Sequence, residues 1–263
     1  MSYLQAILLG VLQGLTEFLP VSSSGHLAFA EREFGWQEGS LAFSVVVHLG
    51  TLLAVVVAYR APLLAMLRDR RRAIVPLALG TAPLFLVLPI KDAVESLHGN
   101  PYVIASGFCL TAVLLLLCDP PWGGREDEPE ATQRLEELSV KQTLVVGCAQ
   151  LCAILEGISR SGSTIAAGVL TGSTRPLAAE FGFLLAIPAI LGAAVLEARH
   201  IQDLAQQSPG PLVAGFVAAL ITGLGAIYLL QWLLRLRRFW VFAPYLLVAA
   251  AVTVWRGQHW APL

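Results

Sequence analysis

Residues 13–26 place a carboxylate, a run of three hydroxyls and an imidazole among apolar residues such as Leu, Val and Phe. These groups belong to Glu17, the serine triplet 22–24 and His26. Burying polar groups without partners is costly, so ionisable residues inside apolar segments usually serve a function. This segment is therefore the first candidate for a reactive site.

A second stretch, residues 150–164, repeats the arrangement and contains Arg160. Residues of the two stretches match at a constant offset of 137. The matched pairs are Gly10 and Gly147, Gln13 and Gln150, Ser22 and Ser159, Ser24 and Ser161, and Gly25 and Gly162. We interpret the two stretches as halves of one site.

These residue types suit phosphoryl chemistry. Short helices that begin after the serines would direct N–H groups and hydroxyls at an anion, and the planar fork of Arg160 matches phosphate or carboxylate oxygens. Glu17 would repel a bare anion, so it fits a divalent-cation ligand or an acid or base. Ser23, close to His26 in the chain, could be an activated nucleophile. Direct attack by water, with Ser23 only binding, stays open.

The composition predicts an integral membrane protein. The chain of 263 residues is 56% hydrophobic and 13% charged, with a formal net charge of -1, whereas soluble domains carry about 25% charged residues. No basic face with interleaved aromatic residues accompanies the arginine clusters, which argues against nucleic-acid binding.

Six apolar stretches approach the roughly 20 residues that a helix needs to cross a bilayer. They are Leu41–Tyr59, Ala73–Ile90, Tyr102–Cys118, Ala178–Leu196, Leu212–Leu234 and Phe239–Val254. The two polar stretches do not fit this template, because Pro20 and the serine triplet interrupt one and residues 159–164 interrupt the other. We expect each to form a helix, a polar elbow and a second short helix that enter and leave on one side.

Non-helical backbone at membrane depth requires surrounding protein or a water-filled cavity, so two elbows predict a shared cavity. Each half then holds one re-entrant pair and three spans, and the odd number inverts the second half. The predicted fold class is an all-α integral membrane protein with an inverted-topology repeat, six transmembrane helices and two re-entrant helix-loop-helix pairs. Its single membrane domain would comprise a first repeat (1–122), a hydrophilic linker (123–139) and a second, inverted repeat (140–263).

This topology also predicts an orientation. The loops 60–72, 119–141 and 235–238 share one side and carry most of the Lys and Arg residues, so that side should be cytoplasmic. Both termini are then expected on the outer side.

Structural roles compete with these functional ones. Serines in membrane helices commonly bond to backbone carbonyls, and one triplet alone would favour that interpretation. Its repetition together with Glu17 and Arg160 favours a site. His48, alone in the span Leu41–Tyr59, is predicted to be a helix–helix hydrogen-bonding residue, with a direct role as the alternative.

At these residues the chain strongly resembles the undecaprenyl-diphosphate phosphatase family, the bacitracin-resistance type of integral membrane phosphatase. The resemblance rests on residues 13–26, Leu49–Val55 and Ser159–Thr164 and extends over nearly the full length. It implies hydrolysis of undecaprenyl diphosphate to undecaprenyl phosphate and inorganic phosphate, which recycles the lipid carrier for cell-wall polymer synthesis and gives bacitracin resistance. The resemblance also implies a divalent cation (Mg²⁺ or Ca²⁺), a homodimer and a bacterial plasma-membrane location, with the site opening to the outer, periplasmic side.

The resemblance assigns roles to individual residues. It implies that Glu17 is the essential metal or acid/base carboxylate, Ser23 the nucleophile, His26 the general acid/base and Arg160 the diphosphate clamp. The further residues that it implies in substrate binding are Ser22, Ser24, Gly25, Ser159, Ser161, Gly162 and Thr164.

The chain departs from the family pattern at two positions. Gln13 stands where many members have a second Glu, so the metal site has one carboxylate fewer and Gln13 itself is a possible ligand. Glu156 precedes Gly157 where members usually carry Pro. We hypothesise that Glu156 supplies the missing negative charge near the cation.

A carrier is the competing class, since inverted repeats with broken helices are typical of transporters. A protein that grips a polyprenyl phosphate could flip it across the bilayer, whereas a small-anion transporter has only the architecture in its favour. The presence of Glu17 and His26 beside Ser23 favours chemistry over passage.

Overall fold

The computed structural model describes residues 1–34, 41–122, 133–197 and 208–260, and every regular element in these ranges is helical. The α-helices are α1 (Tyr3–Phe18), α2 (Ser23–Phe34), α3 (Leu41–Ala58), α4 (Arg60–Arg68), α5 (Ile74–Thr81), α6 (Lys91–Glu95), α7 (Pro101–Cys118), α8 (Val140–Cys152), α9 (Arg160–Leu170), α10 (Arg175–Glu197), α12 (Pro209–Arg235) and α13 (Phe242–Gly257). The 3₁₀ helices are η1 (Arg71–Ala73), η2 (Ala82–Ile90), η3 (Leu135–Glu137) and η5 (Phe239–Val241). The predicted all-α class is confirmed.

Within the described ranges, 5 helical runs are long and apolar enough to cross a membrane. They are Arg71–Glu95, Pro101–Cys118, Arg175–Leu196, Pro209–Arg235 and Phe239–Gly257. A sixth is possible if α3 and α4, which are bent by 69° relative to each other, count as one span. The six predicted stretches thus coincide with these runs and with the bent pair.

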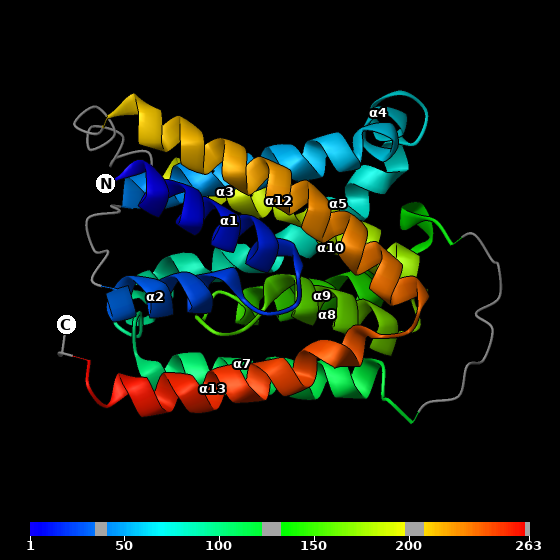
Figure 1. Cartoon of the computed structure of the whole chain (residues 1–263). Helices are drawn as coiled ribbons and strands as arrows, with labels where there is room; N and C mark the ends of the chain where they lie inside the picture. Colours follow the sequence, from blue (N-terminus) through cyan, green and yellow to red (C-terminus); the bar gives the residue numbers. More distant parts are fainter. Residues whose placement is uncertain (35–40, 123–132, 198–207, 261–263) are drawn as a thin grey trace.

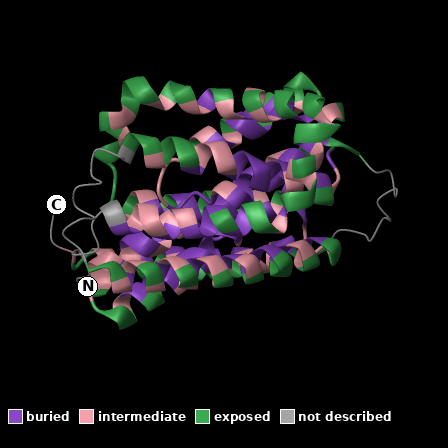
Figure 2. Cartoon of the chain, turned by 90° about the horizontal axis from the view of Figure 1, so that it is seen from above, coloured by how far each residue is buried: buried purple, intermediate pink, exposed green. Residues whose placement is uncertain are grey.

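Exposed residues lie mainly on the outer helices of the bundle, whereas buried residues concentrate in its central helices (Figure 2). Phe85, Val195 and Val248 are among the large hydrophobic residues that remain exposed. Soluble monomers rarely expose apolar surface on this scale, so the outer face fits contact with lipid. The core beneath it is aromatic, with Phe18, Phe181 and Phe183 all buried.

The helices beside the two elbows are shorter than the spans and begin in the same way. Ser2 and Gln5 form a capping box at the start of α1, and Ser139 and Gln142 form one at the start of α8. Each pair ties the side chain of one residue to the backbone N–H of the other, which satisfies N–H groups that a helix start leaves free. The two boxes lie 137 positions apart, as the repeated site residues do.

Helices at corresponding positions in the two halves also make corresponding contacts. Helix α1 packs against α12, and α8 packs against α5 and η2; α12 also contacts α3, and α5 also contacts α10. Gly10 faces the carbonyl oxygen of Gly215 across the first contact, and Gly147 faces that of Gly80 across the second. Glycine permits both close approaches because it has no Cβ.

The basic loops gather at one end of the bundle. Helix α4 and the C-terminal ends of α7 and α12 lie opposite the end that holds the N-terminus (Figure 1). This is the grouping that the sequence predicts. Most of the predicted linker, residues 123–132, lies outside the described residues, so the division into two repeats stays a prediction.

We expect the substitutions Gly10→Ala and Gly147→Ala each to destabilise the protein by about 1–3 kcal/mol, the usual effect of overpacking. The added Cβ at Gly147 would lie 2.6 Å from the Gly80 carbonyl oxygen, and that at Gly10 would clash with Gly215. Gly225→Ala is the matched control, because nothing lies within 4 Å of its Cβ position. Thermal unfolding in detergent measures the effect, and equal melting temperatures for all three variants would contradict this packing.

Candidate functional site

Each elbow leads into a serine-capped helix. The Ser22 hydroxyl accepts a hydrogen bond from the Gly25 N–H at 3.4 Å, and the Ser159 hydroxyl accepts one from the Gly162 N–H at 3.1 Å. Ser22 adopts a φ of 68°, a left-handed conformation that non-glycine residues seldom adopt outside functional or strained turns. The starts of α2 and α9 therefore share the same serine capping hydrogen bond, although Ser159 is extended, with a φ of -74°.

The two elbows touch each other. The hydroxyls of Ser22 and Ser24 lie 3.3 Å apart, and those of Ser159 and Ser161 lie 3.2 Å apart. Ser161 also donates from Oγ to the carbonyl oxygen of Leu19 at 3.2 Å, which joins the second elbow to the first. This contact brings the two predicted halves together, and their role as one site stays a prediction.

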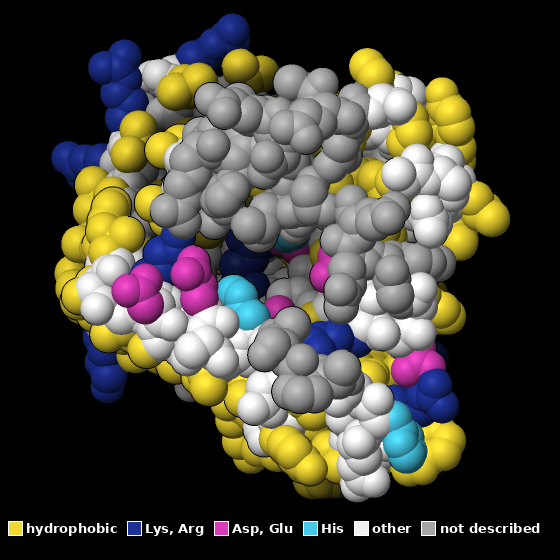
Figure 3. Space-filling model, turned by 90° about the vertical axis from the view of Figure 1, so that its left-hand side faces the viewer, with side chains coloured by type: hydrophobic (Ala, Val, Ile, Leu, Met, Phe, Trp, Pro, Cys, Tyr) yellow, Lys and Arg dark blue, Asp and Glu magenta, His cyan; other side chains and the backbone are white. Residues whose placement is uncertain are grey.

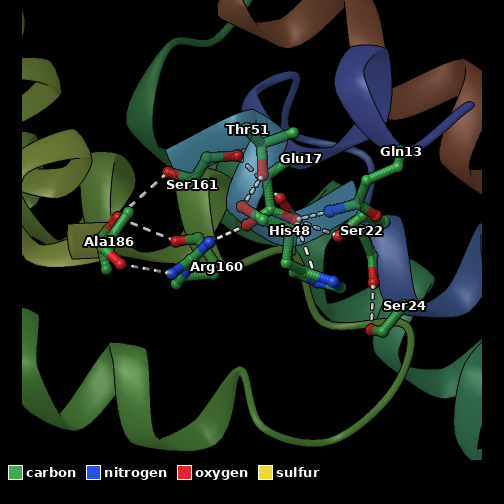
Figure 4. Close-up of polar contacts among 12 residues, drawn as sticks. Gln13, Glu17, Ser22, Ser24, His48, Thr51, Arg160, Ser161 and Ala186 are labelled. Atoms are coloured by element: carbon green, nitrogen blue, oxygen red, sulfur yellow. Dashed lines mark hydrogen bonds and ion pairs between the residues drawn. The ribbon is translucent and has the colours of Figure 1, made fainter. Parts of the chain in front are cut away.

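Glu17 is the centre of the polar cluster (Figure 4). One carboxylate oxygen, Oε2, accepts a hydrogen bond from Ser23 Oγ at 2.5 Å and one from Gln13 Nε2 at 3.0 Å. The other, Oε1, forms an ion pair with the guanidinium of Arg160. Three residues singled out in the sequence thus meet on one carboxylate.

Burial makes this ion pair obligatory. The Glu17 side chain is 3% exposed and that of Arg160 is 19% exposed. A charge in such surroundings needs an opposite charge and hydrogen bonds, because removing one partner leaves the other buried and unpaired. Arg160 remains partly open to water, and its Nη1 also donates to the carbonyl oxygen of Ala186 at 3.4 Å.

The backbone around Arg160 is held by hydroxyls. Thr164 Oγ1 donates to the Arg160 carbonyl oxygen at 2.8 Å. The Ser159 N–H donates to Thr111 Oγ1 at 3.0 Å, and Thr111 is fully buried in α7. These bonds fix the start of α9 and so the direction of the arginine.

His26 has different partners from those predicted. Its Nδ1 lies 2.8 Å from the carbonyl oxygen of Ser22, and its Nε2 lies 2.6 Å from the hydroxyl of Tyr245 in α13. The sequence placed the imidazole near a serine hydroxyl, but both ring nitrogens are engaged elsewhere. The acid/base role of His26 therefore stays a prediction.

Three further residues contact members of this cluster or lie beside one that does, and of these only His48 was considered for a direct role. His48 Nε2 lies 3.9 Å from Glu17 Oε2, although the sequence favoured a structural role for His48. Thr51, one turn further along α3, donates to the His48 carbonyl oxygen at 2.8 Å. In the sequence, His48 stands out only because it lies alone in an apolar span. Nothing in the sequence distinguishes Tyr245, the third residue.

The residues present fit a divalent cation through oxygen donors. Gln13 Oε1 is buried and has no hydrogen-bond partner, beside the carboxylate that Gln13 Nε2 contacts. An orphaned amide oxygen next to a carboxylate is a donor set that Mg²⁺ or Ca²⁺ accepts. In the part of the chain that the structure describes, no three His, Cys, Asp or Glu side chains cluster for a metal, so Glu17 would be the main ligand.

Glu156 points to the loop before α7. Its Oε2 accepts a hydrogen bond from the Gly99 N–H at 2.6 Å. Glu31 lies near enough for the two carboxylates to interact, and burial together with the charge of Glu156 raises the pKa of Glu31 to about 7. No contact within the described residues joins Glu156 to Glu17, so its predicted metal role stays a prediction.

The fold and this cluster define a class: an all-helical membrane protein whose two halves each contribute a serine-capped helix to a buried Glu–Arg centre. The family model "Bacitracin resistance protein BacA" matches residues 6–252. The chain belongs to this family.

Relatives from distant organisms align over nearly the whole chain. A protein of Methanobrevibacter smithii named undecaprenyl-diphosphatase is 39% identical, covering 93% of this chain and 94% of its own length. Proteins of the same name from Carboxydothermus hydrogenoformans and Desulfosudis oleivorans are each 38% identical. The alignment with the Carboxydothermus hydrogenoformans protein covers 93% of this chain and 94% of that protein. The alignment with the Desulfosudis oleivorans protein covers 98% of this chain and 100% of that protein.

The raised pKa of Glu31 predicts a pH-dependent stability. The folded state binds a proton more tightly than the unfolded chain, so this carboxyl opposes folding above pH 7 and stops doing so as the pH falls toward 4.5. We expect Glu31→Gln to raise the melting temperature at pH 8 and to leave it nearly unchanged at pH 4.5.

Glu136→Gln is the control of opposite sign. The hydrogen bonds from Arg70 lower the pKa of Glu136, so its charged form stabilises the folded state above pH 4.5. The control should therefore lower the melting temperature at pH 8. A Glu31→Gln melting temperature that is the same as wild type at both pH values would contradict the assignment.

Proposed function

We propose that the Glu17 cluster removes the terminal phosphate of undecaprenyl diphosphate and releases undecaprenyl phosphate and inorganic phosphate. The observation that carries the proposal is that Arg160 and the Ser23 hydroxyl meet on the Glu17 carboxylate. The name undecaprenyl-diphosphatase, shared by relatives that align over nearly the full chain, supports the substrate. Removing this phosphate would recycle the lipid carrier for cell-wall synthesis and give bacitracin resistance, which agrees with the family's description.

Ser23 is the proposed nucleophile. Its hydroxyl already donates to Glu17 Oε2 at 2.5 Å, so the carboxylate is placed to take the proton as Oγ attacks the terminal phosphorus. The bond from phosphorus to the bridging oxygen breaks and the lipid monophosphate leaves. Water then hydrolyses the phosphoserine, which releases phosphate and restores the Ser23 hydroxyl.

Arg160 is the proposed diphosphate clamp. Its side chain is 19% exposed, and a guanidinium can present two parallel N–H groups to phosphate oxygens. The N–H groups and hydroxyls at the starts of α2 and α9 would surround the remaining charge. The substrate-binding residues are Ser22, Ser24, Gly25, Ser159, Ser161, Gly162 and Thr164.

A divalent cation, Mg²⁺ or Ca²⁺, is the proposed cofactor. Glu17 would hold it, with the buried amide oxygen of Gln13 as a second donor. When bound, such an ion neutralises charge on the phosphate oxygens. The protein's own contribution is to keep these donors dry and fixed, which the burial of Gln13 and Glu17 provides.

The inverted repeat belongs to the same proposal. Its support is the equivalent packing of α1 on α12 and of α8 on α5, together with the capping boxes 137 positions apart. The pairs α1–α2 and α8–α9 would be re-entrant, because each is short and turns at a polar elbow. The basic loops would face the cytoplasm, and the site would open to the periplasmic side of a bacterial plasma membrane. A homodimer is expected from the resemblance alone.

Figure 3 views the end of the bundle that would open outward. Charged and histidine side chains lie in and beside a hollow near its centre, whereas hydrophobic side chains are frequent at the margins. Lipid can supply a headgroup to such a hollow while its tail stays along the apolar flank. A flippase would use the same entrance, but it would have no need of the Ser23–Glu17 contact.

Phosphate release from undecaprenyl diphosphate by purified protein tests the proposal. We expect Ser23→Ala to bind the lipid and lose turnover by at least about 10²-fold, whereas Arg160→Ala should lose both binding and turnover. Chelation should abolish wild-type turnover, and added Mg²⁺ or Ca²⁺ should restore it. Ser208→Ala is the control, because this serine caps α12 without a side-chain hydrogen bond.

The outcomes separate the alternatives. Lipid flipping without phosphate release by the wild type would show a carrier. Retained turnover in Ser23→Ala would show direct attack by water. Retained turnover in Arg160→Ala would show that the reaction does not need Arg160 as a diphosphate clamp.

A further inference from the structure

His48 approaches the carboxylate at the centre of the site without bonding to it. Its Nε2 lies 3.9 Å from Glu17 Oε2, which is too long for a hydrogen bond. The His48 side chain is 31% exposed, whereas that of Glu17 is 3% exposed. Figure 4 shows the imidazole pointing into the same cluster as Arg160 and Gln13.

The helix fixes which nitrogen of His48 carries the proton. Nδ1 lies 2.7 Å from the carbonyl oxygen of Ser44, one turn earlier in α3. A carbonyl oxygen only accepts, so Nδ1 must donate to it, and a neutral ring then has its lone pair on Nε2. Histidine metal ligands have this arrangement, with one nitrogen bonded to a backbone carbonyl and the other facing the metal.

The separation of the two donors suits a bridging cation. A metal about 2.1 Å from an imidazole nitrogen and a carboxylate oxygen holds these atoms about 3.0 Å apart at a right angle and about 4.2 Å apart when opposite. The observed 3.9 Å lies within that range. An ion can therefore join His48 to Glu17 with only small side-chain movements.

Gln13 supplies a third donor. Its buried Oε1 has no hydrogen-bond partner, although its Nε2 bonds to Glu17. A buried amide oxygen without a partner is costly, and a cation would satisfy it. Arg160 pairs with the other carboxylate oxygen, Oε1, so Oε2, the oxygen nearest His48, is shared with the Ser23 hydroxyl and the Gln13 amide N–H rather than with the guanidinium.

We propose that His48 Nε2 is a ligand of the divalent cation held by Glu17, with Gln13 Oε1 completing a site of mixed nitrogen and oxygen donors. The inference rests on the proposed function, because it concerns the cation of that reaction. Imidazole nitrogen favours first-row transition metals over Mg²⁺ and Ca²⁺, which prefer oxygen. The site accordingly binds Mn²⁺ more tightly than either of the hard cations.

His26 provides the internal contrast. Its two ring nitrogens contact the Ser22 carbonyl oxygen and the Tyr245 hydroxyl, so neither presents a lone pair to Glu17. Of these two histidines, only His48 has a nitrogen directed at the carboxylate. The two residues are therefore a matched pair for testing the ligand.

Pulsed EPR of Mn²⁺ bound to the full-length protein tests the proposal without measuring turnover. We expect the wild type to show ¹⁴N modulation from a coordinated imidazole, and ¹⁵N-histidine labelling to replace it with the ¹⁵N pattern. His48→Gln should lose the nitrogen coupling but still bind Mn²⁺ through Glu17, whereas His26→Gln should keep the coupling. The Ca²⁺ concentration that displaces half of the Mn²⁺ should fall at least about tenfold in His48→Gln.

The assignment would be overturned if the wild-type protein failed to bind Mn²⁺ or bound it without nitrogen coupling. It would also be overturned if the coupling persisted in His48→Gln. The labelled wild type decides the question if His48→Gln does not fold. Phosphate release is a separate readout. Turnover without nitrogen coupling would reject His48 as a ligand and leave the proposed function standing. Nitrogen coupling without turnover would support His48 as a ligand and contradict the proposed function.

Discussion

The ion pair between Glu17 and Arg160 is the interaction on which the site depends. It joins residues 143 positions apart, one from each half of the chain, in surroundings that leave Glu17 nearly dry. Neither charge is stable there alone, because its desolvation is offset only by the other. The pair therefore forces the two elbows together and places the Ser23 hydroxyl and the arginine on opposite oxygens of one carboxylate.

The same constraint explains the surrounding polar residues. Buried polar groups are costly without partners, and accordingly Ser161 bonds to the Leu19 carbonyl and Thr111 accepts from the Ser159 N–H. These bonds stiffen the elbows, and the close glycine contacts behind them, such as that of Gly147 with Gly80, fix the helices that carry them. A dry, rigid centre strengthens the electrostatic interactions that phosphoryl transfer requires.

Periodicity and repetition predicted most of this structure. The apolar runs mark the spans, and the 137-residue offset identifies the equivalent elbows, because both are local properties of the chain. The partners of His26 and the approach of His48 to Glu17 were not predictable in this way. Tyr245 lies 219 positions from His26, and the direction of the His48 ring follows from the packing of α3 in the bundle. Glu156 shows the same limit, since its Gly99 partner lies in a distant loop.

A double-mutant cycle on the unfolding free energy, with Glu17→Gln, Arg160→Gln and the double variant in detergent, tests the central claim most directly. Each single variant strands one buried charge, so each should lose about 3–5 kcal/mol. The double variant strands neither and should lose clearly less than the sum of the two. Losses that simply add would show that the two charges do not meet, and would contradict the account of a shared site.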